Sequence, residues 1–189
     1  MAKDDDGGRN WIESLNWPGL KNVLFRPDRY NYVKKVFPTT ECVFCVAAQD
    51  APKFENLVVH RSEYSLIVIN KYPYNSGHLL VMPRAHIGGL LKLDTRQYTD
   101  LHECLRLALR AVEEVYEPQA VNIGMNHGKV AGAGIPEHLH YHLVPRWGGD
   151  TNFFPLIAGT KVVVENLDTS YARLKSWFSE NLDEGTVTR

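Results

Sequence analysis

The sequence predicts an α+β fold with an antiparallel sheet, and three observations lead to it. Residues 64–70 and 78–82 are short, apolar and partly β-branched, and turn-forming residues separate them, which is typical of a hairpin. Residues 94–117 place apolar side chains at helical spacing over several turns. Strands and helices do not alternate regularly along the chain, which favours α+β over a doubly wound parallel sheet.

Length, composition and charge bound the possible functions. The 189 residues are 44% hydrophobic and 23% charged, which is normal for one globular domain. The formal net charge is −1, so no global field attracts nucleic acid or an anionic membrane. No stretch approaches the roughly 20 apolar residues of a membrane-spanning helix, and residues 1–10 lack the features of a secretory signal. We therefore expect a cytoplasmic protein without nucleic-acid or membrane partners.

The expected organisation is a single domain between two short tails. Residues 1–10 are small, acidic and glycine-containing, which predicts a disordered N-terminal tail. The domain is expected to span 11–183, beginning with an aromatic-rich segment over 11–41 that wraps the core. Residues 184–189 are expected to form a loose tail.

The remaining elements follow from local spacing and from turn residues. A short helix is predicted over 42–49. Asp94 is placed to cap the helix over 94–117, and Pro118 is placed to end it. Further strands are predicted at 121–125 and 161–165, and a closing helix at 168–182.

The segment 137–145 carries the chemistry. Three histidines stand in it at a spacing of two: His138, His140 and His142. On a strand they share one face, and the apolar side chains between them take the other face: Leu139, Tyr141 and Leu143. Buried ring nitrogens need hydrogen-bond partners, so three imidazoles on one face indicate a site rather than packing. Two alternatives stay open, a strand face exposed to water and a metal site with three histidine ligands.

The flanking segments supply groups that suit a phosphorylated ligand. Glycines within 126–135 allow backbone amides to approach a phosphate closely. After the histidines, Arg146 can serve a phosphate or a structural ion pair. Trp147 can stack on a nucleotide base or pack against the domain. Together these groups predict a phosphate-sized pocket beside the histidine segment.

These motifs, in this order, resemble the histidine triad family. HLHYHLV fits the family's pattern of three histidines separated by apolar residues, and the resemblance covers about residues 40–155, including CVFC and INKYPYNSGHLLVMPRAHI. The longer PEHLHYHLVPRWGGDTNF is similar to the branch that handles diadenosine polyphosphates, both hydrolases and phosphorylases. The resemblance implies an antiparallel sheet of about five strands, one long central helix and a C-terminal helix, joined across a homodimer.

The resemblance also implies a role for each histidine. His140 is the implied nucleophile, whose neutral imidazole attacks the α-phosphorus and forms a nucleotidyl-histidine intermediate. His138 is implied to fix the strand geometry. His142 is implied to hydrogen-bond the phosphate or the leaving group.

Substrate contacts follow from the same resemblance. Asn70 is implied to contact the ribose, and Asn126 to contact phosphate or ribose with His127 as a helper. The alternative for the two amides is hydrogen bonding within turns. Many family members carry a hydroxyl residue shortly before the triad, and this chain has none there. The backbone amides of Gly134 and Ile135 are expected to bind phosphate instead.

The cysteines predict a metal site rather than disulfides. Three cysteines, an odd number, argue against a disulfide framework. Cys42 and Cys45 form half of a tetrahedral site, and the resemblance implies that His86 and His138 complete it around a structural zinc. The alternative is a pair of unliganded cysteines with His86 at the surface. Cys104, within the long helix, is expected to pack in the core.

Three functions remain open at this stage. The first is a hydrolase of dinucleoside polyphosphates or other nucleotide conjugates. The second is a nucleotidyltransferase or phosphorylase that passes the nucleotidyl group to phosphate. The third is a nucleotide-binding module with little turnover. A trapped nucleotidyl group on His140 would exclude the third, and product analysis with and without phosphate would separate the first two.

Overall fold

The computed structural model describes residues 41–49, 51–150 and 165–182. The expected tails, nearly all of the segment 11–41, and the strand expected at 161–165 except its last residue lie outside these ranges. Among the described residues, no helix combines the length and the apolar character that crossing a membrane requires.

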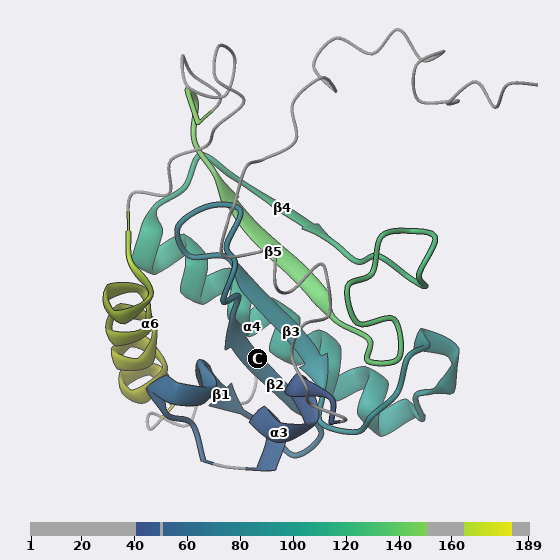
Figure 1. Ribbon diagram of the computed structural model, residues 1–189. Coiled ribbons are helices and arrows are strands. Elements are labelled where there is room, and N and C mark those ends of the chain that lie inside the picture. The colour runs from purple at the N-terminus through teal and green to yellow at the C-terminus, as the bar shows by residue number, and fades with distance from the viewer. Residues whose placement is uncertain (1–40, 50, 151–164, 183–189) are drawn as a thin grey trace, which may run out of the picture. The chain divides into compact units, whose positions relative to one another are not determined.

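Five strands form one antiparallel sheet in the order β1-β2-β3-β5-β4 (Figure 1). Their bounds are β1 Val58–Arg61, β2 Ser65–Ile69, β3 Leu79–Pro83, β4 Ala120–Gly124 and β5 Tyr141–Arg146. The predicted hairpin is β2 and β3, which pair from Ile69 with Leu79 to Ser65 with Pro83. β1 adds to the predicted strands. It has only four residues and a register shift between Val58 and His60, so its side-chain pattern is weak.

The long helix α4 (Thr95–Tyr116) begins and ends where its sequence predicts. Asp94 accepts a hydrogen bond from the Gln97 N–H at 2.9 Å, and Gln97 accepts one from the Asp94 N–H at 3.2 Å. This capping box satisfies two backbone groups at the helix start. The chain leaves the helix at Glu117, whose φ of 45° is left-handed, directly before Pro118.

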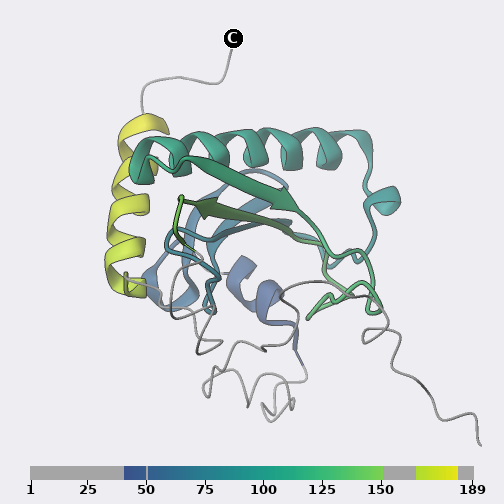
Figure 2. The same cartoon turned by 90° about the horizontal axis from the view of Figure 1, so that it is seen from above.

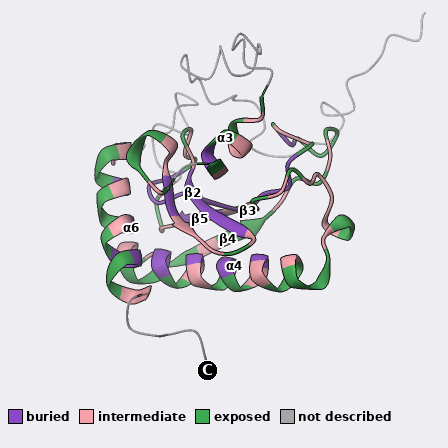
Figure 3. Cartoon of the chain, turned by 90° about the horizontal axis from the view of Figure 1, so that it is seen from below, coloured by how far each residue is buried: buried purple, intermediate pink, exposed green. Residues whose placement is uncertain are grey.

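Helices cover both faces of the sheet. α4 and α6 (Leu167–Leu182) lie on one face, and the short α3 (Val43–Gln49) lies on the other (Figure 2). Figure 3 shows the buried residues of α4 along its side toward the sheet. The residues of β2 alternate between two apolar clusters: Ile67 and Ile69 pack toward α4 and α6, whereas Leu66 and Val68 pack toward α3.

The histidine segment forms less strand than its alternation predicts. β5 begins at Tyr141, so His138 and His140 precede the ladder. The reason is a turn in which the His138 N–H bonds to the Ile135 carbonyl, together with the proline that ends β3 and offers no N–H. The alternation itself holds, because Leu139 and Leu143 are in the core and Tyr141 packs against it.

Candidate active site

The three histidine rings lie on the α3 side of the sheet. The Phe44 ring of α3 contacts His138 and His140 at centroid distances of 5.4 and 5.2 Å. His142 follows, 5.0 Å from His140. His140 and His142 line a cavity of about 380 Å³, whereas His138 lies beyond it. The shared face therefore divides into two sites, a cavity and a cysteine–histidine cluster.

Hydrogen bonding fixes which nitrogen of His140 can react. Its Nδ1 lies 2.8 Å from the carbonyl oxygen of His138. A carbonyl only accepts, so Nδ1 must carry the proton. Nε2 of the neutral ring then holds a lone pair, and His140 can act as a nucleophile through that atom.

A second histidine, His78, fixes the proton on His142. The Tyr74 N–H donates to His78 Nδ1 at 3.0 Å, so His78 carries its proton on Nε2. That Nε2–H donates to His142 Nδ1 at 3.0 Å. His142 is therefore protonated on Nε2 in its neutral form, so that nitrogen is a donor while Nε2 of His140 is a lone pair.

Burial keeps these rings neutral. It lowers the pKa of His138 and of His140 below the usual histidine value, because a buried charge loses its hydration. For His142, burial together with the neighbouring His140 lowers the pKa to about 4. Near pH 7 the nucleophilic lone pair is therefore available without prior loss of a proton.

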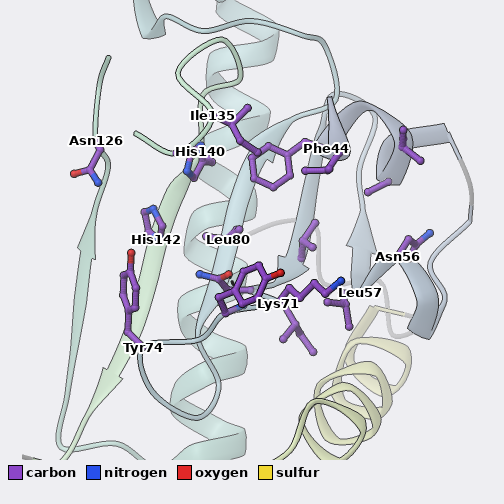
Figure 4. A pocket seen from close by; sticks show the side chains of 18 of the residues that line it. Phe44, Asn56, Leu57, Lys71, Tyr74, Leu80, Asn126, Ile135, His140 and His142 are labelled. Atoms are coloured by element: carbon purple, nitrogen blue, oxygen red, sulfur yellow. Dashed lines mark hydrogen bonds between the residues drawn. The ribbon is translucent and has the colours of Figure 1, made fainter. Parts of the chain in front are cut away.

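The cavity has an apolar wall and a polar rim. The wall comes mainly from α3, β2 and β3, and it includes Phe44, Leu57, Val68 and Leu80. The rim includes Asn70, Lys71, Tyr72, Tyr74, Asn126, Gly134 and Ile135. Figure 4 shows Asn126 and Tyr74 on one side of the two histidines and Phe44 and Leu57 on the other. The arrangement suits a molecule with an apolar ring at one end and anionic groups at the other.

The two asparagines predicted to bind substrate both line the cavity and also hold its edges. Asn70 accepts a hydrogen bond from the Tyr72 N–H at 3.0 Å and places its amide nitrogen 3.3 Å from His78 Nδ1. Asn126 donates to the Gly132 carbonyl at 3.4 Å, within the glycine-rich loop. Each asparagine can therefore keep its hydrogen bond within the protein and also contact a ligand, because a side-chain amide offers two N–H donors and two acceptor lone pairs.

Two further predicted residues lie outside the cavity lining. His127 accepts a hydrogen bond from the Leu90 N–H at 3.4 Å. Trp147 follows β5, and its backbone N–H donates to the Asp150 carboxylate at 3.5 Å. Arg146 forms the structural ion pair, with 2.6 and 2.9 Å contacts to the Asp150 carboxylate.

His78, Tyr74 and Phe44 are site residues that the sequence patterns did not single out. His78 is fully buried directly before β3, with Asn70 across the hairpin. A histidine directly before an apolar strand was the sequence signal that could have identified His78 as a site residue. Gly77, with a φ of +74°, shapes the turn that leads into it.

Cys42, Cys45, His86 and His138 converge on one point, with all four ligand atoms within 4.8 Å of one another. The Cys42 and Cys45 sulfurs lie 3.5 and 3.6 Å from His138 Nδ1, and Cys45 lies 3.2 Å from His86 Nδ1. A tetrahedral Zn²⁺, with bonds of about 2.3 Å to sulfur and 2.0 Å to nitrogen, requires sulfur–nitrogen separations of about 3.5 Å, which these three distances match. His138 also donates from Nε2 to the Pro83 carbonyl at 2.8 Å, which leaves Nδ1 free for a metal.

Residues 51–149 match the family model of the HIT domain. The chain belongs to the HIT family. It is 41% identical over 162 residues to a Mycobacterium tuberculosis protein named AP-4-A phosphorylase, covering 82% of this chain and 83% of that one. It is 34% identical over 93 residues to the asymmetrical bis(5'-nucleosyl)-tetraphosphatase of Schizosaccharomyces pombe, covering 49% of this chain and 50% of that one.

Solved structures of HIT proteins share the fold. A zinc-bound histidine triad family protein from Mycobacterium smegmatis superposes with a TM-score of 0.59 at 27% identity, covering 76% of this chain and 96% of that one. A hypothetical histidine triad nucleotide-binding protein from Sulfolobus tokodaii gives a TM-score of 0.60 at 24% identity, covering 78% and 99%. The predicted α+β fold with five antiparallel strands is confirmed.

Proposed function

We propose that this HIT protein is an enzyme that cleaves dinucleoside polyphosphates through a nucleotidyl group carried on His140. The observation that carries the proposal is the pair of opposite protonation states in the cavity, a lone pair on His140 Nε2 beside an N–H on His142. The named relatives support the substrate class, since one is an AP-4-A phosphorylase and another a bis(5'-nucleosyl)-tetraphosphatase.

In the first step, His140 Nε2 attacks the α-phosphorus. The bond from that phosphorus to its bridging oxygen breaks, and the departing phosphate chain takes the electron pair. The His138 carbonyl, 2.8 Å from Nδ1, stabilises the positive ring of the adduct. The His142 N–H hydrogen-bonds the phosphate oxygens. In the second step an acceptor oxygen attacks the same phosphorus, and the electron pair of the N–P bond returns to His140. An anionic oxygen of inorganic phosphate attacks without losing a proton, whereas water releases one to the solvent.

The cavity walls support a nucleoside subsite on the α3 side. Phe44, Leu57 and Leu80 present apolar surface of the kind that buries a base. Asn70 then meets the ribose at the strand end. Asn126 and the amides of Gly134 and Ile135 face the phosphate, and the glycine-rich loop allows that close approach. His127 and Trp147 remain predicted substrate contacts on sequence grounds only.

Phosphate is the favoured acceptor, and water is the alternative. The phosphorylase relative aligns over most of this chain, whereas the tetraphosphatase aligns over about half. With phosphate, diadenosine tetraphosphate yields ADP and ATP, and with water it yields AMP and ATP. Chromatography of the products formed with and without phosphate distinguishes the two.

The His140→Asn variant tests the covalent mechanism. We expect turnover to be lost while the affinity for AMP stays within about tenfold, because most binding contacts come from other residues. Acid-stable protein modification is not expected, since an N–P bond to histidine is acid-labile; rapid alkaline quench with radiolabelled substrate is the suitable trap. Undiminished turnover in this variant, or a binding-only wild-type protein, would overturn the proposal.

The cysteine–histidine cluster is proposed to hold a structural zinc, supported by its sulfur–nitrogen distances of 3.2, 3.5 and 3.6 Å and by the zinc-bound relative. Four protein ligands leave no open position, so the metal would supply rigidity rather than activate water. It would hold α3 against His138. The homodimer and the cytoplasmic location stay predictions, and light scattering of the purified protein checks the first.

A further inference from the structure

The cavity has a second side that the nucleoside does not need. With a base against Phe44 and Leu57 and its α-phosphorus at His140, the rest of the phosphate chain must extend away from the apolar wall. Figure 4 shows Asn126 and Tyr74 on that opposite side, next to His142. An incoming acceptor must reach the phosphorus from the region that the leaving group vacates, because attack on phosphorus is roughly in line.

Two contacts position Tyr74 at this side. Its backbone N–H bonds to His78 at 3.0 Å, and its ring stacks on His142 with a 15° interplanar angle and a centroid distance of 5.9 Å. The next residue, Asn75, is buried and donates to the Pro145 carbonyl at 2.7 Å. The turn thus positions the Tyr74 backbone and the stacking on His142 orients its ring without help from a substrate, which is what a pre-organised contact requires.

The Tyr74 hydroxyl is available for a ligand. The residue is 38% exposed, and its hydroxyl makes no hydrogen bond to the described part of the chain. In Figure 4 the hydroxyl end is directed toward His142. The glycine-rich loop across the cavity, residues 126–137, contains no serine, threonine or tyrosine. Tyr74 therefore places a hydroxyl donor beside the histidine that faces the phosphate.

We propose that the Tyr74 hydroxyl binds the phosphate groups beyond the one that is attacked. It donates a hydrogen bond to the leaving phosphate chain in the first step and to the incoming inorganic phosphate in the second. No bond to Tyr74 forms or breaks, and its proton stays on the phenol. This inference rests on the proposed function, since it assigns the acceptor subsite of that same reaction.

The test compares Tyr74→Phe, which keeps the ring against His142, with Tyr98→Phe as a matched control on the exposed surface of α4. We expect Tyr74→Phe to lower kcat/KM for diadenosine tetraphosphate and to raise KM for phosphate, roughly 10- to 100-fold, as for a lost hydrogen bond to a charged group. The AMP affinity and the Tm should match those of the wild type. Tyr98→Phe should match the wild type in every measurement.

Adenosine 5'-phosphoramidate distinguishes a lost contact between the Tyr74 hydroxyl and the phosphate chain from an indirect effect of the substitution on His142. Its leaving group carries no phosphate, so the rate of adenylyl transfer to His140 from this substrate should be the same in Tyr74→Phe and wild type. Equal losses on both substrates, or no loss on the tetraphosphate, would overturn the inference while leaving the proposed function standing. A wild-type protein that transfers no adenylyl group from either substrate would refute the proposed function itself.

Discussion

Removing one cluster ligand should affect both stability and nucleotide binding, because α3 carries Cys45 together with Phe44, and Cys42 directly precedes the helix. The perturbation is Cys45→Ser. Its sulfur lies 3.2 and 3.6 Å from the two histidine nitrogens of the cluster, so the substitution breaks the tetrahedral set. Burial and the adjacent Cys42 raise the pKa of Cys45 to about 11, so the thiolate that a metal site requires forms here only when a cation binds.

The size of the effect follows from binding linkage and from packing. A metal present at 1,000 times its Kd stabilises the folded state by about 4 kcal/mol. For a chain of this length that corresponds to a Tm shift of roughly 8–16 °C. The Phe44 ring touches His138 and His140 and lines the cavity. If α3 loosens, a base loses a stacking surface, and we expect the AMP affinity to fall about tenfold.

The assays are calorimetric. Scanning calorimetry and AMP titration are run on wild type and Cys45→Ser, each with and without a zinc chelator. The chelator should lower the Tm and the AMP affinity of the wild type and change neither in Cys45→Ser. The variant therefore controls for effects of the chelator that do not come from metal removal at the cluster. Identical wild-type values with and without chelator, in protein that elemental analysis shows to have lost its zinc to the chelator, would refute the reasoning.

Two further predictions concern the histidines. His78→Leu should lower kcat about tenfold, because His142 loses the 3.0 Å hydrogen bond that orients its ring and holds its proton on Nε2. Nitrogen NMR of the His142 ring checks the position of that proton. The control variant is His102→Leu on α4. The acid limb of kcat/KM should lie below pH 6.5, because falling pH removes the His140 lone pair only below its lowered pKa. A pH profile with its acid midpoint at 7 or above would contradict the burial argument.

Local features were predictable where a few neighbouring residues decide them. The start of α4 was readable because Asp94 and Gln97 cap the helix within one turn. The β2–β3 hairpin was readable from two apolar runs around turn residues. The position at which β5 begins was not predictable, because it depends on distant residues. The proline that ends β3 and the turn at Ile135 together prevent the β3–β5 ladder from including His140, so β5 begins at Tyr141.

The sequence by itself determined the alternation that puts three imidazoles on one side of the chain, because backbone geometry sets side-chain direction within a few residues. Only the tertiary structure decided what each ring faces. His138 meets a cysteine 96 positions away, and His142 meets His78 across a separation of 64. Such partners are brought together by the packing of α3 and the hairpin, and they fix which nitrogen holds a proton and which holds a lone pair.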